Sequence, residues 1–183
     1  MVIQGTQPGN ANYSAAPPVS QTLVVAKKLL TVTVADATRQ VGATDPQFTV
    51  SYAGFVGTET AAVLDTPPTV TSAANAASGA GEYALTAAGG VDDSYSFTYV
   101  NGKLTISLLP QTITFAAIAD RMFGDPLLIL AATASSGLPV SYAVVSGPAT
   151  VSGTAVTFTS PGVVTVRASQ AGDPTFAAAA SVE

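Results

Sequence analysis

The sequence lacks cysteine, histidine and tryptophan altogether, and charged residues make up only 9% of its 183 positions. Without cysteine no disulfide can form. Without cysteine and histidine the chain also lacks the commonest general bases, nucleophiles and ligands of transition metals. Chemistry built on those groups is excluded, and any catalysis would have to use carboxylates, lysine, hydroxyl groups or tyrosine. We expect the protein not to be an enzyme and to need no cofactor.

Clustered charge and long apolar runs are also missing. Eleven acidic and six basic residues are scattered along the chain and give a net charge of −5, whereas nucleic-acid binding needs clustered Lys or Arg. No apolar run is long enough for a transmembrane helix, and Met1 does not open a secretory signal pattern. Because 48% of the residues are apolar, the composition is not that of a disordered chain. We expect a folded protein with neither membrane insertion nor a nucleic-acid partner.

What the chain does contain is a dense series of strand patterns. Short segments rich in Val, Thr, Tyr and Phe alternate between apolar and polar positions, which is typical of half-buried strands. Gly and Pro separate these segments at intervals of roughly 8–12 residues, which is the spacing expected of an all-β sandwich. The segments are 29–34, 47–52, 95–100, 103–107, 111–115, 140–145, 155–159 and 163–167.

Two local patterns between these segments carry specific predictions. Asn101-Gly102 stands between two strand segments, and this dipeptide favours the type I′ turn of a two-residue β-hairpin. The Ala-rich segment 72–80 has helical propensity but no apolar stripe at helical spacing. We therefore predict a hairpin at Asn101-Gly102 and a loop or extended segment at 72–80.

The first twenty residues recur, in altered form, as the last twenty. At an offset of 163 positions, residues 7, 9, 15, 16 and 19 meet identical residues at 170, 172, 178, 179 and 182. Tyr13 falls on Phe176 and Asn10 on Asp173, which preserves shape. Both ends therefore look like the end of one kind of module, and the chain is interpreted as a window onto a tandem array.

A second internal pattern indicates the module boundaries. Arg39 and Gly42 precede an Asp-Pro pair at 45–46, and Arg121 and Gly124 precede another at 125–126. We predict a tail or terminal strand of a preceding repeat at 1–26, a first module at 27–109 and a second module at 110–183. The junctions are short and contain no Gly/Ser tract, so we expect closely coupled modules.

The first module, which closes on "YVNGKLTI", resembles the bacterial MBG repeat domain, an immunoglobulin-like module. It departs from the usual pattern at Val41, where such repeats carry an aromatic residue before the turn glycine. The second module, with "SGLPVSY" and "VRASQAGD", resembles the Ig-like repeat that commonly alternates with MBG domains. The resemblance implies an all-β fold of tandem immunoglobulin-like β-sandwiches. It also implies an adhesin-like stalk in a large secreted or surface protein, located outside the cell or on the bacterial surface. It supplies no ligand by itself.

Aspartates in the loops are the candidates for a metal site. Asp oxygens are the ligands that calcium prefers, and the candidates are Asp92, Asp93, Asp45 and Asp125. Their spacing fits neither an EF-hand nor a nonapeptide calcium loop, and an aspartate before proline also accepts local backbone hydrogen bonds in turns. A calcium-binding module is thus an alternative to the structural one.

Three further chemistries have candidate residues. A glycosidase would need a pair of acids, drawn from Glu59, Glu82, Asp92 and Asp93. A Lys–Asn isopeptide crosslink would need one of the three lysines, at 27, 28 and 103. A carbohydrate-stacking face would use the aromatic residues at 52, 55, 95, 97 and 99, whose strand spacing equally indicates core and cross-strand packing.

The last candidate is a self-association site. The second module lacks a match to the strand formed by Gln21, Thr22, Leu23, Val24 and Val25. Either the ends are arbitrary cuts, or this strand of one chain completes the second module of the next and builds a head-to-tail filament. The expected partner is then a second copy of the chain or a neighbouring repeat of the same array.

Overall fold

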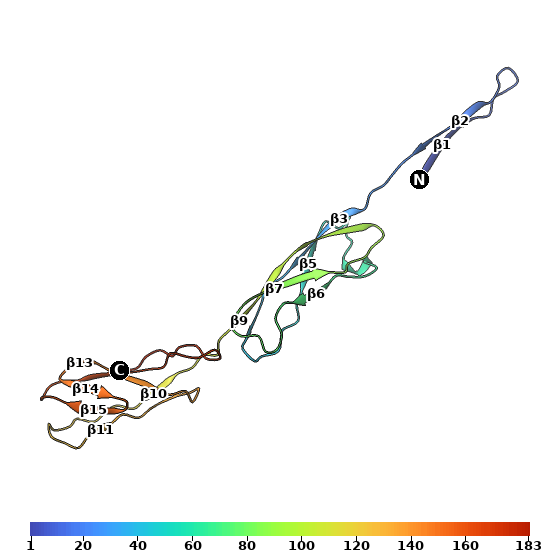
Figure 1. Ribbon diagram of the computed structural model, residues 1–183. Coiled ribbons are helices and arrows are strands. Elements are labelled where there is room, and N and C mark those ends of the chain that lie inside the picture. Colours follow the sequence, from blue (N-terminus) through green and yellow to red (C-terminus); the bar gives the residue numbers. More distant parts are fainter. The chain divides into compact units, whose positions relative to one another are not determined.

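A computed structural model describes all residues from 1 to 183 and confirms the all-β class (Figure 1). Strands account for 47% of the residues and helix for 2%, and the several sheets are compatible with the sandwich fold expected from the strand patterns. The chain divides into two compact units. The first comprises 1–35, 49–71 and 86–101, and the second 36–48, 72–85 and 102–183. This division cuts β6 (Thr69–Ser72) and β7 (Gly81–Ala88), whose residues fall in both units. The domain boundaries drawn from the sequence remain predictions.

The first unit contains an N-terminal hairpin and a three-stranded sheet. The sheet has the order β5-β3-β8, formed by β3 (Lys28–Val34), β5 (Val50–Ala53) and β8 (Tyr95–Val100). β5 runs antiparallel to β3, and β8 runs parallel to it. Alternate residues of β3 are buried, which is the period expected of a strand with one face in the core. A short 3-10 helix, η1 (Ala61–Val63), also belongs to this unit and was not predicted.

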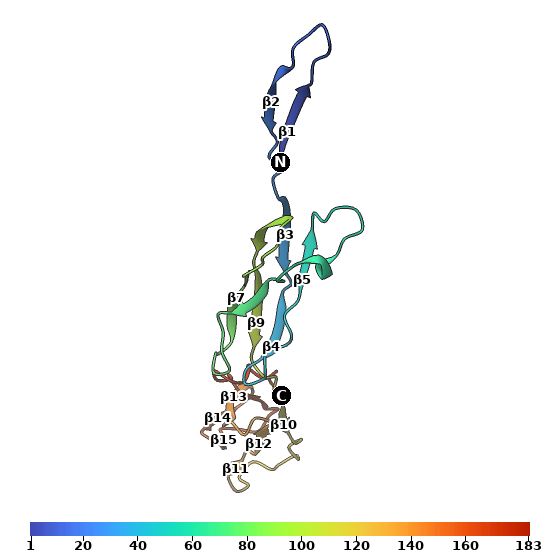
Figure 2. The same cartoon turned by 90° about the vertical axis from the view of Figure 1, so that its right-hand side faces the viewer.

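The N-terminal hairpin pairs β1 (Val2–Gln7) with β2 (Ala16–Thr22), as Figure 2 shows. The strands are antiparallel, in a register that places Val2 opposite Thr22 and Gly5 opposite Val19. Every residue of both strands is exposed. A two-stranded hairpin with no buried face is marginally stable on its own in water. The hairpin therefore holds no hydrophobic core.

The second unit contains most of a four-stranded sheet of order β4-β9-β7-β6. β9 runs parallel to β4 and antiparallel to β7. Leu85, Leu104 and Ile106 are at most 2% exposed and form its buried face. The four strands are β4 (Ala37–Gln40), β6 (Thr69–Ser72), β7 (Gly81–Ala88) and β9 (Gly102–Ser107).

The rest of the second unit is the C-terminal part of the chain. Its core joins Leu130, Val156 and Val166, with Phe115, Tyr142 and Phe158 among the residues packed against it. The pairings are β10-β12, β11-β15-β14 and β13-β16, all antiparallel. The strands are β10 (Ile113–Phe115), β11 (Leu128–Ile129), β12 (Ala132–Ala134), β13 (Ser141–Ser146), β14 (Ala149–Ser152), β15 (Ala155–Phe158) and β16 (Thr165–Ser169).

The predicted hairpin at Asn101-Gly102 is wrong. β8 and β9 do not pair with each other: β8 belongs to the sheet of β3, and β9 to the sheet of β4 and β7. Neither Asn101 nor Gly102 has a positive φ, as a type I′ turn requires at both positions. The dipeptide instead lies where the chain passes from one sheet to the other, so tertiary pairing overrides the local turn preference.

The other strand predictions are confirmed with shifted boundaries. β8 has its predicted limits, whereas β5 begins at Val50 and β16 at Thr165, later than the sequence pattern indicated. The segment 73–80 contains no helix and only turns and bends, which confirms the prediction for the Ala-rich stretch.

Candidate functional site

The two copies of the terminal sequence fold into hairpins with the same internal bonds. Gln7 Oε1 accepts a bond from the backbone N–H of Gly9 at 3.1 Å, and Gln170 Oε1 accepts one from Gly172 at 2.5 Å. Both glycines have positive φ, 75° and 81°, and an added Cβ would collide with the main chain opposite. Glycine is therefore required at this point in both copies.

The tips of the two hairpins also correspond. Asn10 Oδ1 accepts hydrogen bonds from the backbone N–H groups two and three positions further on, at 2.9 and 3.1 Å. Asp173 Oδ1 makes the same two bonds, both at 2.7 Å. Carboxylate and amide oxygens both serve as acceptors in such turns, which explains why Asn and Asp exchange here. The repeat found in the sequence is thus a repeat of structure.

The surroundings of the two hairpins differ. In the second copy, Gln170 is 8% exposed and accepts a 2.6 Å bond from Gln111 Nε2, which also donates to Ala177 O at 2.7 Å. Backbone bonds of 2.8 Å join Leu109 to Thr175 and to Ala177. Gln7, by contrast, lies in a strand whose residues are all exposed. The C-terminal hairpin is therefore built into a folded module, and the N-terminal hairpin is its undocked counterpart.

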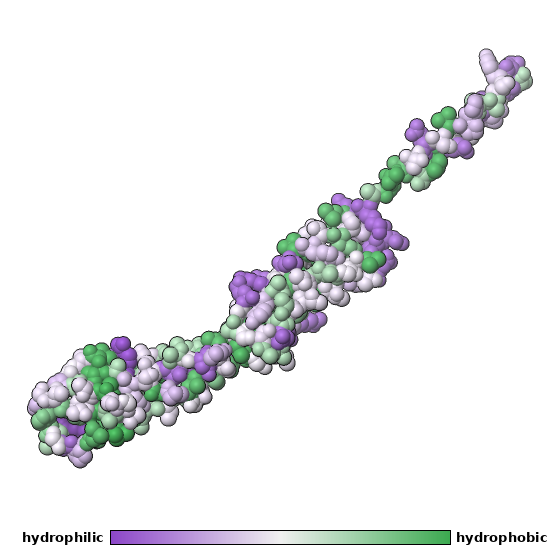
Figure 3. Space-filling model, viewed as in Figure 1, coloured by the Kyte–Doolittle hydropathy of each residue, from purple (hydrophilic) through white to green (hydrophobic).

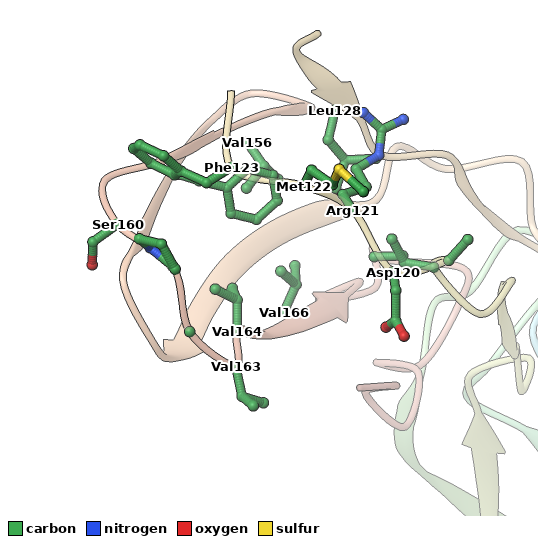
Figure 4. A pocket seen from close by; sticks show the side chains of 15 residues that line it. Asp120, Arg121, Met122, Phe123, Leu128, Val156, Ser160, Val163, Val164 and Val166 are labelled. Carbon is green, nitrogen blue, oxygen red and sulfur yellow. The ribbon is translucent and has the colours of Figure 1, made fainter. Parts of the chain in front are cut away.

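A groove of about 500 Å³ lies in the C-terminal part of the chain, and its lining mixes apolar side chains with Asp120, Arg121 and Ser160 (Figure 4). Its walls are the loop 118–123 on one side and residues of β15 and β16 with their flanking segments on the other. Met122 is 80% exposed, Phe123 59% and Val163 87%, which is unusual for side chains of this kind. In Figure 3 hydrophobic atoms gather over this part of the chain, where Figure 1 places β11 and β15.

The residues assigned to self-association lie at the end of the N-terminal hairpin. Gln21 and Thr22 pair with Ile3 and Val2 in β1. Beyond them the exposed fractions are 47% for Leu23 and 81% for both Val24 and Val25. The structure thus holds the predicted donor strand in a register with β1 and leaves its three apolar side chains largely in solvent.

The aromatic residues proposed for sugar stacking belong mainly to the core of the first unit. Tyr95 is 3% exposed and clusters with Leu30 and Leu64, while Tyr52, Phe55 and Phe97 pack against them. Phe55 and Tyr95 meet edge to face at a centroid distance of 5.4 Å. The Tyr95 hydroxyl donates to a carboxylate oxygen of Glu59 and accepts a 3.0 Å bond from the N–H of Val56. The bond to Glu59, followed by burial, raises the pKa of Tyr95.

The other aromatic pair lies on β8. Phe97 and Tyr99 stack with an interplanar angle of 7° at 6.3 Å, as expected for residues two apart on one face of a strand. The Tyr99 hydroxyl accepts a 3.1 Å bond from the N–H of Gly90. Burial, followed by the charge on Tyr99, raises the pKa of Tyr52. These rings pack against protein groups, in agreement with the core interpretation of their spacing.

Each aspartate predicted as a calcium ligand contacts a different group. Asp92 is 6% exposed, and its Oδ1 accepts hydrogen bonds from the backbone N–H groups of Ser94 and Tyr95, at 2.7 and 2.9 Å. Asp45 Oδ1 lies 2.5 Å from Arg39 Nε, and Asp125 Oδ2 accepts a 2.9 Å bond from the N–H of Met122. Asp93 donates its N–H to Asp65 Oδ2 at 3.1 Å. No group of three or more acidic residues is placed to hold a metal ion, and calcium binding remains a prediction.

Two of the acids considered for glycoside hydrolysis and two of the lysines considered for an isopeptide crosslink form side-chain hydrogen bonds. Glu82 Oε1 accepts a 2.7 Å bond from Lys103 Nζ on the surface, and this bond raises the pKa of Lys103. Lys27 Nζ donates to the backbone oxygen of Asp92 at 2.7 Å. Glu59, as described, contacts Tyr95. The hydrogen-bond partners of Glu59 and Glu82 are thus a tyrosine and a lysine.

Sequence reasoning missed a buried ion pair in the first module. Arg39 has a side chain only 2% exposed, and besides Asp45 it donates to the backbone oxygens of Gln40 and Asn75 at 3.2 and 2.8 Å. The Arg-x-x-Gly pattern followed by Asp-Pro was the available signal. We assign the pair a structural role, because the hydrogen bonds of the Arg39 guanidinium all go to groups of the protein itself.

Comparison with known proteins assigns one segment of the chain to a known type of domain. Residues 30–105 match the model of the MBG domain (YGX type). This supports the MBG-type assignment of the first module, and the matched family is a non-catalytic, repeat-type domain family. No curated protein and no solved structure matches the chain. None of the helices is long and apolar enough to cross a membrane.

Proposed function

We propose that this chain is a non-enzymatic structural segment of a bacterial surface or secreted repeat protein, where it acts as a stiff, adhesin-like stalk. The proposal is supported by the repeated hairpins, by the MBG-type segment between them and by the absence of histidine and cysteine. Its partners in this role are neighbouring repeats of the same array.

The observation that carries the proposal is a pair of parallel strand pairings. β3 and β8 are parallel from Lys28 opposite Tyr95 onward, and β4 and β9 are parallel up to Gln40 opposite Ser107. When force pulls Lys28 toward one end and Ser107 toward the other, parallel neighbours are loaded in shear. All hydrogen bonds of a pairing must then break together, whereas peeling breaks them one at a time.

Force spectroscopy on the single molecule tests this role, and the absence of native cysteine makes handle attachment specific. Handles at Lys28→Cys and Ser107→Cys load the strands in shear, and handles at Gln40→Cys and Ser107→Cys peel the same β4–β9 pairing from one end. We expect a several-fold higher unfolding force in shear, and an extended length of about 280 Å between the handles at 28 and 107 once the segment has unfolded. Equal forces in the two geometries would contradict the mechanical role.

We further propose that the chain associates with itself head to tail, through donation of the strand 21–25 to the module 110–183. The low charge of the surface offers little repulsion against such contact. Light scattering of the full chain across a concentration series is expected to give species that grow with concentration. A monomer at every concentration would overturn this part of the proposal and leave the mechanical part intact.

A further inference from the structure

The linker 108–112, which joins β9 to β10, is held at both of its ends. Before it, the backbone oxygen of Ser107 accepts a 2.9 Å bond from the N–H of Val41. At its far end, the N–H of Thr112 donates to Ser135 Oγ at 3.0 Å, and the oxygen of Thr112 accepts a 2.9 Å bond from the N–H of Ser135. The residues between these two points therefore decide whether the chain can bend here.

The C-terminal hairpin, residues 170–179, closes on the middle of this linker. The N–H of Leu109 donates to the oxygen of Thr175, and the oxygen of Leu109 accepts a bond from the N–H of Ala177, both at 2.8 Å. These two bonds make Leu109 the parallel bridge partner of Phe176, so the hairpin holds both backbone groups of the linker residue. Linker and hairpin belong to the same compact unit, and the dark red hairpin lies beside the linker in Figure 1.

A buried side chain adds a second attachment. Gln111 is 7% exposed, and its Nε2 donates to Gln170 Oε1 at 2.6 Å and to the oxygen of Ala177 at 2.7 Å. Its Oε1 accepts a 2.5 Å bond from Ser136 Oγ. Ala177 thus binds Leu109 through its N–H and Gln111 through its oxygen. One residue of the hairpin spans the centre of the linker.

Pro110, between these two attachments, removes further freedom. Its ring fixes its own φ near −65° and restricts the preceding residue to extended conformations. Leu108 is then the one residue of the linker that neither a hydrogen bond nor the proline restrains. The linker therefore retains little of the torsional freedom that a hinge between modules requires.

The linker 23–27, between β2 and β3, has the same length but is built differently. Its residues 24–26 form no backbone hydrogen bond, and Val24 and Val25 are each 81% exposed. Regular bonding resumes only at Lys28, whose N–H donates to the oxygen of Ser94 at 2.8 Å. The two linkers differ in restraint and not in length, so each serves as a control for the other.

We propose that the C-terminal hairpin is a clasp that closes on the linker 108–112 and prevents the stalk from bending there. This inference rests on the stalk role proposed above and specifies where its stiffness arises. The clasped linker and the two modules that it joins then behave as one stiff element. The chain bends instead at 24–26, where no hairpin is bonded to the linker.

Distances between pairs of spin labels, measured by pulsed electron paramagnetic resonance, test this difference, and the chain has no cysteine to interfere with labelling. The labels go to exposed positions. The pair Ala88→Cys/Thr154→Cys spans the clasped linker, and the pair Val19→Cys/Ala88→Cys spans the other one. We expect the distance distribution across 23–27 to be at least about twofold wider than that across 108–112. Equal widths would overturn the proposal.

The substitution Gly172→Ala opens the clasp without touching the linker. Gly172 has a φ of 81°, and an added Cβ would collide with the backbone oxygen of Phe176, in the strand that binds Leu109. We expect the amide protons of Leu109 and Ala177 to exchange with solvent at least about tenfold faster. The distance distribution across the linker should widen at the same time.

The matched control is Gly9→Ala. It introduces the same strain into the N-terminal hairpin, where Gly9 has a φ of 75° and an added Cβ would also collide with the main chain. The distribution across 108–112 is expected to stay as it is. Widening by both substitutions alike would overturn the clasp, since the effect would then not depend on contact with the linker.

A second variant weakens the clasp from the side of the linker. Gln111→Met keeps the length of the side chain and removes its two hydrogen-bond donations. We expect the distribution across the linker to widen here as well. This variant decides the matter if fast amide exchange in β15 shows that Gly172→Ala has unfolded the C-terminal core. An unchanged distribution in spite of fast exchange at Leu109 would overturn the clasp.

The result can be separated from the mechanical role. The shear measurement loads the chain between positions 28 and 107, outside the clasp. A wide distribution across 108–112 together with a high shear force would reject the clasp and leave the stalk role standing. A narrow distribution with a low shear force would reject the mechanical role and leave the clasp.

Discussion

Asp36 Oδ1 accepts a 2.8 Å hydrogen bond from the backbone N–H of Lys103, 67 positions further along the chain. The same offset relates every residue pair in the parallel pairings of β3 with β8 and of β4 with β9. Asp36 and Lys103 follow the two points where the chain passes from one sheet to the other. The aspartate therefore caps an N–H group where the regular strand pairing is interrupted.

Removing this cap is expected to weaken the fold modestly. Asp36→Ala leaves the N–H of Lys103 without its acceptor, and we expect a loss of about 1 kcal/mol in the free energy of unfolding. Urea unfolding followed by circular dichroism measures it. Asp120→Ala, at an exposed aspartate outside the strands, serves as control and is expected to stay within about 0.5 kcal/mol of the unsubstituted chain. Equal effects would contradict a specific role for Asp36.

The buried pair of Arg39 and Asp45 predicts a larger effect. Asp45→Asn keeps the shape of the side chain but removes the charge that balances a guanidinium whose side chain is 2% exposed. Two backbone acceptors of Arg39 remain, so we expect a loss of about 1–3 kcal/mol. Thermal unfolding of Asp45→Asn and of the surface variant Asp125→Asn gives the comparison. A smaller effect at Asp45 than at Asp125 would show that the pair contributes nothing to stability.

The repeated hairpins provide a matched pair of positions. Gln170→Ala would remove one of the two bonds that the buried amide of Gln111 donates and the acceptor of the Gly172 N–H, and we expect a loss of about 1–3 kcal/mol. Gln7→Ala changes the corresponding residue of the exposed hairpin and is expected to be neutral. Urea unfolding of both variants tests whether the same residue, in the same hairpin, matters only where the hairpin is docked. Similar losses at both positions would contradict this explanation.

Alkaline pH is expected to destabilise the protein through Tyr95. The bond to Glu59, and then burial, raises the pKa of Tyr95 above its ordinary value of 10.0. The folded state therefore favours the protonated hydroxyl, and its contribution is complete below pH 10.0. It is lost as the pH rises from there through the raised pKa of the folded state. The raised pKa of Lys103 acts in the same direction.

Tyr95→Phe keeps the ring but removes the titrating group. We expect this variant to be less stable than the unsubstituted chain near neutral pH, with a shallower loss of stability above pH 10.0, in urea unfolding at several pH values. Tyr13→Phe, at a tyrosine 74% exposed, is the control and should follow the unsubstituted chain. Parallel curves for all three proteins would exclude Tyr95 as the source of the pH dependence.

Local sequence patterns were sufficient for most of the strands. Alternation predicted β8 with its observed limits, because one face of that strand packs on the core and the other does not. The boundaries of β5 and β16 were less accurate, since hydrogen-bonded partners decide where a strand begins. The turn at Asn101-Gly102 failed for the same reason. Asn-Gly favours a type I′ turn locally, but the pairing of β8 with β3 and of β9 with β4 outweighs this preference.

The sequence by itself determined the all-β class, the repeat at an offset of 163 and the absence of histidine and cysteine chemistry, because these depend on composition and spacing alone. Only the tertiary structure decided that Arg39 and Asp45 form a buried pair and that Tyr95 meets Glu59. It likewise decided which copy of the hairpin is docked. Each of these depends on which distant segments of the chain come into contact, and a local stretch of sequence does not determine the energy of such contacts.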